Sequence, residues 1–275
     1  MKTFPILLPA GEDVIAAVVT VPDGQPRGVV IVLAGTGRHN VIGGTMAGLL
    51  TARVAAEGLA SVRLDYAGVG DSPGLVESWS PAHVGRALDA ARTAVRTVGE
   101  AVGASRFVAV GTCYGSRVSL HLVDEPTCIG AVCLAPPILD HGSVAAAGKT
   151  LGGRRLVSAA RSAPVLRTIL RPVVRLARAR KPSRGVLQAL ANLQRARIVF
   201  LYGSPKHEDH YSRKAHESVD AALGKLSAEE RERFELRFLD LGPLTTFDGL
   251  DAPEQDAILD TVVPYVRACF APEPG

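Results

Sequence analysis

The sequence of 275 residues contains no apolar run of the roughly 18 residues that a transmembrane helix needs, so we expect no membrane span. Its first residues hold too short an apolar run for a signal peptide, and acidic residues follow at once. The four cysteines, Cys113, Cys128, Cys133 and Cys269, include no C-x-x-C pair and no metal-ligand spacing. Motifs typical of nucleotide loops and nucleic-acid binding are also missing. These absences predict a cytoplasmic protein with reduced thiols, no cofactor, no metal and no nucleic-acid partner.

Acidic residues are missing from one long interval. Residues 141–207 contain 14 Lys or Arg and no Asp or Glu, whereas the rest of the chain carries 17 basic and 27 acidic residues. A segment with many basic residues and no acidic ones creates a local positive field. Two interpretations stay open. The segment is either a solvated helix face or a dock for something anionic, such as a carrier protein, coenzyme A phosphates or a membrane surface.

Short β-branched apolar runs alternate with helical patterns along most of the chain. We expect strands at 14–21, 28–33, 60–64, 107–110, 128–134, 197–202 and 234–241, and helices at 46–58, 81–98 and 253–270. Continuous apolar strands separated by helices are typical of a parallel sheet that is buried on both faces. The pattern therefore predicts an α/β fold, with a mostly parallel sheet covered by helices on both faces.

This alternation breaks after the strand at 128–134. Residues 142–194 show no strand pattern, and apolar residues recur at helical spacing among Arg167, Arg171 and Arg175. We expect 141–196 to form a basic helical cap inserted into a single domain, 1–275, with these three arginines as candidate contacts for a substrate or carrier. The apolar positions of this cap either pack as core or line a substrate tunnel.

A strand-turn-helix pattern surrounds Cys113, which is the centre of Gly111-Thr112-Cys113-Tyr114-Gly115. This context favours a sharp, strained turn that presents a nucleophile, with glycines where a side chain would clash. A thiol at a helix N-terminus is favoured as the thiolate. The alternative is a buried structural cysteine in an ordinary turn between a strand and a helix.

Together these features resemble the α/β-hydrolase superfamily over nearly the whole chain. The markers, in chain order, are the glycine loop 35–37, the run Arg63-x-Asp65-x-x-Gly68-x-Gly70-x-Ser72, the 111–115 turn, the cap, and Leu201-Tyr202-Gly203 with an acid a few residues on. The resemblance implies an active site at the C-terminal ends of the strands, under the cap. It implies Cys113 as nucleophile, the N–H groups of Thr36 and Tyr114 as oxyanion hole, and Asp209 as the catalytic acid.

The chain departs from this family where the catalytic histidine belongs. The family carries a histidine in the loop after the last strand, commonly before a Thr-Phe pair, but Thr245 stands there and no histidine follows His216. Serine without a base would be nearly inert, whereas cysteine is partly thiolate at neutral pH, so the two departures could belong together. His39 and His210 are the best candidates for a displaced base. The histidines at 141 and 207 also follow predicted strands, and each of the four could instead be a surface residue.

Three function classes fit these residues. One is an acyl hydrolase or acyltransferase in specialised (polyketide-like) or acyl metabolism. It would use Cys113 to attack an ester, lactone or thioester. Its small acyl substrate would be free or carried on coenzyme A or a carrier protein. The dienelactone hydrolases resemble it in carrying cysteine at this turn, but they keep the late histidine. A second is a lyase that eliminates a carboxylate such as acetate, which needs no complete triad. The third is a binding protein on an inactive hydrolase fold.

Overall fold

The structure, a computed structural model, describes residues 1–35, 46–74, 84–136, 184–204, 220, 223–242, 244 and 251–271. Its elements are β1 (Lys2–Ala10), β2 (Asp13–Val21), β3 (Val29–Leu33), α1 (Met46–Ala56), β4 (Ala60–Leu64), α2 (Gly85–Val102), β5 (Phe107–Thr112), α3 (Tyr114–Leu122), β6 (Cys128–Leu134), α7 (Arg184–Ala191), β7 (Arg197–Tyr202), α9 (Ala228–Glu232), β8 (Phe234–Phe238) and α10 (Ala252–Cys269).

The eight strands form one sheet in the order β1-β2-β4-β3-β5-β6-β7-β8. The strands β1 and β2 pair antiparallel, and β2 also runs antiparallel to β4, while every other neighbouring pair is parallel. The C-terminal ends of β3, β5, β6 and β7 therefore meet at one edge of the sheet. The predicted α/β class and mostly parallel sheet are confirmed.

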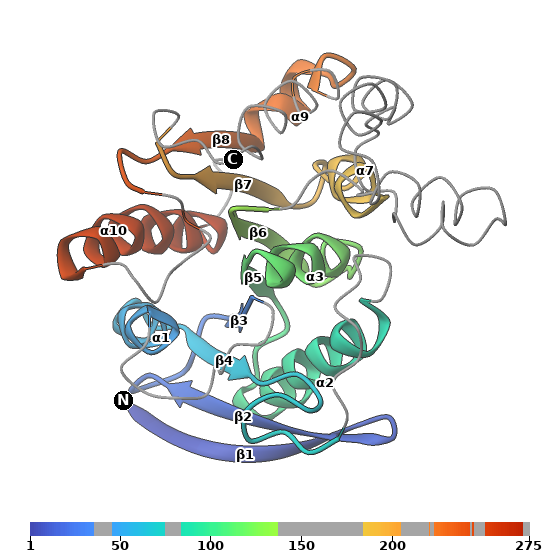
Figure 1. The fold of residues 1–275 in the computed structure, drawn as a ribbon, viewed down its shortest axis with the longest axis vertical. Coiled ribbons are helices and arrows are strands. Elements are labelled where there is room, and N and C mark those ends of the chain that lie inside the picture. The colour runs from blue at the N-terminus through green and yellow to red at the C-terminus, as the bar shows by residue number, and fades with distance from the viewer. Residues whose placement is uncertain are drawn as a thin grey trace, which may run out of the picture.

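Both faces of the sheet are buried, which explains why its central strands are almost entirely apolar. All five residues of β3 and all five of β4 are buried. Alternate residues feed two separate cores, with Ile31 and Leu33 in one and Val30 and Val32 in the other. The helices α2, α3 and α7 cover the first face, and α1 and α10 cover the second (Figure 1). A strand buried in this way has no polar alternation, as the sequence indicated.

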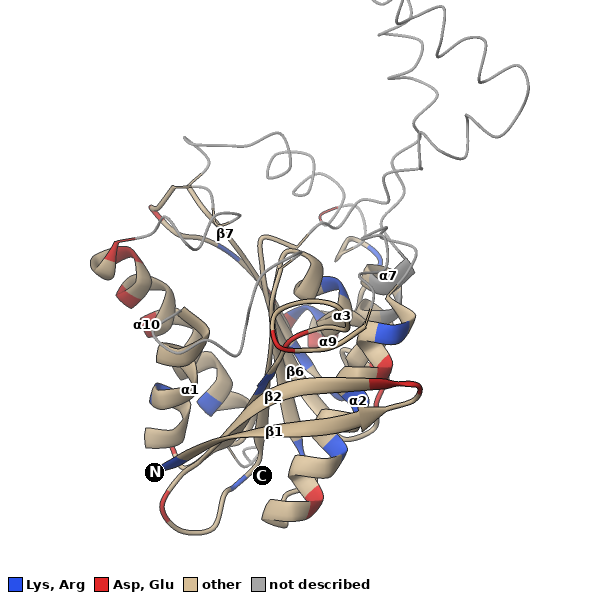
Figure 2. Cartoon of the chain, turned by 60° about the horizontal axis from the view of Figure 1, so that its bottom comes forward, with Lys and Arg blue, Asp and Glu red and all other residues tan. Residues whose placement is uncertain are grey.

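The helix termini follow local chemistry. Helix α10 begins at a capping box in which the Asp251 side chain accepts from the N–H of Glu254 and the Glu254 side chain accepts from the N–H of Asp251. Acidic side chains gather at this end of α10 (Figure 2), where they complement the helix dipole. Helix α2 ends at Gly103, whose φ of 68° is the left-handed conformation of a glycine C-cap.

One strand was not predicted, and two elements, α2 and β8, differ from their predicted bounds by three residues or more. Strand β1 was not predicted, because Pro5 and Pro9 interrupt its pattern; proline is tolerated there because β1 is an edge strand and one side has no ladder partner. Helix α2 begins at Gly85 rather than 81 and has no side-chain cap. Strand β8 ends at Phe238 rather than 241. Strand pairing and packing in the folded chain set these bounds, and the sequence pattern does not show them.

Most of the predicted cap, residues 141–183, lies outside the described residues. Its last part contains α7, which packs into the core on the α3 side of the sheet through Val186 and Leu190. Beyond α7, the Asn192 side chain donates to the carboxylate of Asp124 at 2.7 Å. This contact ties the segment to the end of α3. The boundaries of the cap stay a prediction.

Candidate active site at the Cys113 turn

Cys113 stands between β5 and α3 in an unusual backbone conformation. Its φ is 51° and its ψ is −109°, and α3 begins at the next residue. A non-glycine residue in the left-handed half of conformational space costs of order 1–3 kcal/mol, so the surrounding structure must hold it there. The geometry is the sharp strand-to-helix turn that the sequence predicted, with the side chain at its apex.

Two glycines make this turn possible by their lack of a side chain. A Cβ at Gly115 would lie 2.3 Å from the carbonyl oxygen of Leu33 and 2.7 Å from that of Ala34. A Cβ at Gly111 would lie 2.3 Å from the carbonyl oxygen of Gly115. Helix α3 therefore starts in direct contact with the end of β3, and the expected clash at both glycine positions is confirmed.

Hydrogen bonds to β6 hold the turn from its other side. The N–H of Cys113 donates to the carbonyl of Leu134 at 2.9 Å. The hydroxyl of Ser116, which is fully buried, lies 2.7 Å from the carbonyl oxygen of Gly111 and 3.0 Å from that of Leu134. One serine thus joins the end of β5, the first turn of α3 and the end of β6, so the strained residue is fixed from three directions.

Cys113 is chemically distinct from the other cysteines. Its side chain is partly exposed, whereas Cys128, Cys133 and Cys269 are buried. Burial raises the pKa of Cys128 and that of Cys269 to about 12, and it raises the pKa of Cys133 as well. The three buried thiols are therefore protonated and inert at neutral pH. Cys113 is therefore the one cysteine of the four whose side chain is open to solvent.

The chain that leaves β3 passes directly against the turn. A Cβ at Gly35 would be 3.6 Å from the Cβ of Cys113. Helix α3 begins at Tyr114, directly after Cys113, so the N-terminus of this helix lies at the turn. Backbone N–H groups at a helix N-terminus are suited to binding a developing oxyanion. The turn, the end of β3 and the start of α3 together can therefore hold a nucleophile beside an oxyanion donor.

Tyr66 braces this arrangement, and the sequence reasoning missed its role. Its hydroxyl donates to the carbonyl of Ala34 at 3.2 Å, and its ring contacts the Tyr114 ring edge-on with centroids 5.5 Å apart. Burial raises the pKa of Tyr66 well above its usual value, so the hydroxyl stays a donor. The signal that could have identified it is its position directly after β4, at the same sheet edge as Cys113.

The run from Arg63 to Ser72 is structural in this molecule. The Ser72 hydroxyl donates to the carbonyl of Asp65 at 2.7 Å and accepts from the N–H of Ala16 at 2.8 Å. Arg63 donates to the Thr51 hydroxyl at 2.9 Å, which joins β4 to α1. This turn fixes the segment that carries Tyr66, because its two ends are tied to β2 and α1.

Of the predicted site residues, the structure describes Cys113 and Tyr114 and brings them together at the turn. The other proposed residues lie outside the described residues: Thr36, His39, His210, Asp209, Arg167, Arg171 and Arg175, together with the less favoured histidines at 141 and 207. Gly35, Pro136 and Ser204, the last described residues before these segments, follow β3, β6 and β7 at the C-terminal edge of the sheet. The placement of a base and an acid stays a prediction.

Within the described residues, no group of three or more His, Cys, Asp or Glu side chains could hold a metal ion. Among the helices of the described ranges, none is long and apolar enough to cross a membrane.

Comparison with known proteins places the fold. No protein-family model matches the chain, and no curated protein sequence matches it. Solved structures do match over nearly its whole length. An esterase of Pyrococcus furiosus has a TM-score of 0.64 at 13% identity, over 98% of this chain and 92% of the esterase. The alpha/beta hydrolase domain-containing protein 10 of mouse has a TM-score of 0.56 at 14% identity, over 96% and 99%. An alpha-beta serine hydrolase homologue of Coxiella burnetii has a TM-score of 0.57 at 16% identity, over 97% and 98%.

At such low identities the likeness concerns the fold alone. The chain has the α/β-hydrolase fold, with its sheet order, its helices on both faces and a sharp turn after β5.

Proposed function

We propose that this protein is an acyl-transferring enzyme that uses Cys113 as its nucleophile on an ester or thioester. The observation that carries the proposal is the state of Cys113 itself: a partly exposed thiol, held at a φ of 51° at the N-terminus of α3. A structural cysteine gains nothing from this strain. A nucleophile at this position is exposed to substrate, is favoured as the thiolate by the helix dipole, and lies beside backbone N–H donors.

The proposed reaction has two steps. The Cys113 thiolate attacks the carbonyl carbon and a carbon–sulfur bond forms. The bond between the carbonyl carbon and the alcohol oxygen or thiol sulfur then breaks, and the leaving group takes up the proton that the Cys113 thiol had released. Water, or a second alcohol or amine, then attacks the acyl-enzyme, which releases the acid or the transferred product and returns the thiol. In this proposal the N–H groups of Tyr114 and Thr36 stabilise the negative charge on the carbonyl oxygen in both steps.

The second step requires a base, and the chain offers candidates only in segments beyond the described residues. We propose His39, after β3, or His210, after β7, as this base, with Asp209 as the acid. His39 follows β3 in the chain, and β3 is the direct neighbour of β5 in the sheet, so we favour His39 over His210.

The fold neighbours are consistent with acyl chemistry. Their names include an esterase, a serine hydrolase homologue and a proline iminopeptidase of Mycobacterium smegmatis. All of these names denote cleavage of an acyl bond or descent from enzymes that cleave one. Because one fold hosts many activities, this agreement supports the reaction class but not a substrate.

The basic interval suggests how a substrate is delivered. We propose that Arg167, Arg171 and Arg175 belong to a cap that docks an anionic carrier, either coenzyme A or an acidic carrier protein. The matched comparison is one acyl group on coenzyme A and on an uncharged ester, with wild type and Arg171→Glu at low salt. The docking proposal requires the variant to lose activity on the coenzyme A substrate alone, and equal rates on both substrates would refute it.

Trapping the acyl-enzyme tests the nucleophile directly. Wild-type protein, Cys113→Ala and Cys128→Ala are incubated with p-nitrophenyl acetate and with acetyl-coenzyme A, and intact masses are recorded. We expect an added acetyl group on wild type and on Cys128→Ala, and none on Cys113→Ala. Because Cys128 is buried, its variant controls for the loss of a cysteine as such.

The other outcomes separate the rival functions. An adduct on Cys113→Ala would place the chemistry elsewhere. No adduct on any protein, together with release of a carboxylic acid and an alkene product, would indicate the lyase. Stabilisation by ligands without any turnover would indicate a binding protein.

A further inference from the structure

Buried tyrosines hold the backbone on either side of β5. Tyr66 follows β4, and its hydroxyl donates at 3.2 Å to the carbonyl of Ala34, which follows β3. Tyr202 ends β7, and its hydroxyl donates at 3.0 Å to the carbonyl of Pro136, beyond β6. Both β4 and β7 lie two strands from β5 in the sheet order. The two hydrogen bonds are therefore alike in kind and in their distance from β5, but they differ in what the held carbonyl contacts.

The carbonyl oxygen of Ala34 lies against the start of α3. A Cβ at Gly115 would be 2.7 Å from this oxygen. The carbonyl of Ala34 and the N–H of Gly35 belong to one planar peptide bond, so a hydrogen bond that holds the first also sets the direction of the second. A Cβ at Gly35 would in turn lie 3.6 Å from the Cβ of Cys113. Tyr66 therefore holds a peptide that adjoins both the first turn of α3 and the candidate nucleophile.

The ring of Tyr66 contacts the other side of the same turn. It meets the ring of Tyr114 edge-on, with centroids 5.5 Å apart, and both residues are buried. The N–H of Tyr114 is an oxyanion donor in the proposed function. The ring of Tyr202, by contrast, stacks on Phe238 of the edge strand β8 at 5.9 Å. Of these two tyrosines, Tyr66 is the one that contacts both the end of β3 and the first residue of α3.

The hydroxyl of Tyr66 is a fixed hydrogen-bond donor. Burial raises the pKa of Tyr66 well above its usual value, and the neighbouring Tyr114 and Cys113 raise it further. The hydroxyl therefore keeps its proton near neutral pH and does not serve as a base. The backbone around it is also held, because the Tyr66 carbonyl accepts from the N–H of Val69 at 2.9 Å and the N–H of Asp65 donates to β2 at 3.0 Å.

We propose that Tyr66 is a positioning residue for acyl transfer at Cys113, an inference that rests on the proposed function. Through the Ala34 carbonyl and the Tyr114 ring, it sets how the end of β3 and the start of α3 face each other. Oxyanion donors act only when they lie about 2.7–3.1 Å from the place where negative charge develops. Without the hydroxyl, the peptide after Ala34 is no longer held, and the backbone donors lose their alignment with the substrate carbonyl oxygen.

The thiol itself does not depend on this hydroxyl. The N–H of Cys113 donates to the carbonyl of Leu134 at 2.9 Å, and the Ser116 hydroxyl lies 3.0 Å from the same carbonyl oxygen. These contacts come from β6, on the opposite side of β5 from β3. Loss of the Tyr66 hydroxyl should therefore change oxyanion stabilisation and leave the exposure and ionisation of the Cys113 thiol as they are.

Two reagents separate these two properties. With p-nitrophenyl acetate, the thiolate adds to the carbonyl carbon, and an oxyanion forms before p-nitrophenolate leaves. With iodoacetamide, the sulfur displaces iodide, so a carbon–sulfur bond forms as the carbon–iodine bond breaks and no oxyanion arises. The alkylation rate thus reports the thiolate alone. The ratio of the acylation rate to the alkylation rate reports the oxyanion donors.

Both rates are measured by intact mass on the full-length protein, wild type beside Tyr66→Phe. We expect Tyr66→Phe to be acylated about tenfold more slowly than wild type and alkylated at the wild-type rate. Removing an oxyanion donor outright costs roughly 10²–10³-fold, and a donor that is only misaligned should cost less. The pH dependence of acylation should keep its wild-type shape, because Tyr66 aligns other groups and does not exchange a proton with substrate.

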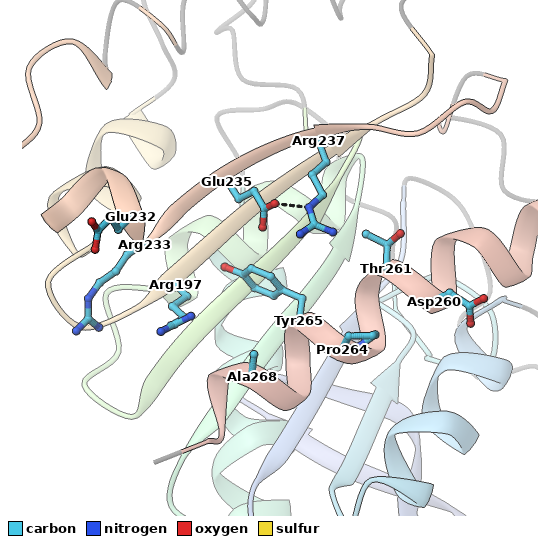
Figure 3. Close-up of a pocket in the computed structure, with 10 residues that line it drawn as sticks. All are labelled: Arg197, Glu232, Arg233, Glu235, Arg237, Asp260, Thr261, Pro264, Tyr265 and Ala268. Atoms are coloured by element: carbon cyan, nitrogen blue, oxygen red, sulfur yellow. Dashed lines mark hydrogen bonds and ion pairs between the residues drawn. The ribbon is translucent and has the colours of Figure 1, made fainter. Parts of the chain in front are cut away.

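Two further tyrosines supply matched controls. Tyr202→Phe removes the same kind of hydrogen bond on the other side of β5 and should leave both rates unchanged. Tyr265 lines a cavity of about 280 Å³ between β8 and α10 (Figure 3), and its buried hydroxyl oxygen has no hydrogen-bond partner among the described residues. Tyr265→Phe should likewise change neither rate, since β8 is three strands from β5.

The positioning role is overturned if Tyr66→Phe is acylated at the wild-type rate, or if acylation and alkylation slow by the same factor. It is also overturned if Tyr202→Phe slows acylation as much as Tyr66→Phe does, because the effect would then be general loss of stability. A wild-type protein that is alkylated at Cys113 but never acylated would overturn the proposed function, and the role of Tyr66 with it. The failure of one proposal is therefore distinguishable from the failure of the other.

Discussion

Gly115→Ala offers the sharpest test of the site, because one added methyl group meets only backbone. The new Cβ would lie 2.3 Å from the Leu33 oxygen and 2.7 Å from the Ala34 oxygen. Ordinary carbon-to-oxygen contacts are about 3.3 Å or longer, so α3 and the end of β3 must separate by about 1 Å. Neither partner is a flexible side chain that can turn aside.

The magnitude follows from two opposing effects. Overpacking of this kind costs about 3 kcal/mol in a core, at the upper end of its range because both elements are rigid. Replacing glycine by alanine in a helix returns about 1 kcal/mol. We therefore expect Gly115→Ala to lower the free energy of unfolding by about 2 kcal/mol.

Gly85→Ala is the matched control. Gly85 is the first residue of α2, its φ is not positive, and its Cβ would meet no described atom within 4 Å. The same chemical change should there raise the free energy of unfolding by about 0.4–1 kcal/mol. Urea denaturation followed by circular dichroism measures both variants. If Gly115→Ala is as stable as Gly85→Ala, α3 does not approach β3 as described, and the explanation of this turn is wrong.

Four further predictions concern the turn and the cysteine thiols. Cys113→Gly should raise the free energy of unfolding by about 1 kcal/mol over Cys113→Ala, because glycine relieves the positive φ; a lower stability than the alanine variant in urea denaturation would contradict the strain. Tyr66→Phe removes a hydroxyl that donates to the carbonyl of Ala34, and Tyr202→Phe removes one that donates to the carbonyl of Pro136. Each variant should lower the free energy of unfolding by about 1 kcal/mol. Only Tyr66→Phe should also slow the acylation that intact mass measures. Ellman's reagent should titrate one thiol in the native protein and four after unfolding. Burial raises the pKa of Cys128 and Cys269 to about 12 in the folded protein, whereas an unfolded thiol titrates near about pH 8.5. The free energy of unfolding should therefore be constant below about pH 8.5 and fall above it, by up to ~1.4 kcal/mol per pH unit for each thiol. A urea midpoint that does not change between about pH 8 and about 10.5 would refute this.

Predictions from sequence succeeded where one local pattern decides the structure. The strands at 60–64, 128–134 and 197–202 have the predicted boundaries. Their apolar runs have no alternation because both faces of the sheet are covered, and nothing in their neighbourhood competes with that pattern. The turn at Cys113 was recognisable for a similar reason, since the residues that make it possible, two glycines and the cysteine between them, lie within five positions.

Predictions failed where a partner distant in the sequence decides the outcome. Strand β1 is an exception, because its partner β2 follows it directly in the chain and only its prolines interrupted the strand pattern. The role of Tyr66 depends on the Ala34 carbonyl and on the Tyr114 ring, which are far away in the chain. The pairing of β8 with β7 places Glu235 beside Val199 and Arg237 beside Leu201, which the sequence pattern does not show.

The sequence by itself therefore determined the class of fold, the position of the candidate nucleophile and the glycines that permit its turn, because each depends on residue types at short spacing. Only the tertiary structure decided what braces that turn and which three thiols are buried. Burial, close backbone contact and charge pairing are properties of surfaces that meet on folding, and sequence spacing does not specify which surfaces those are.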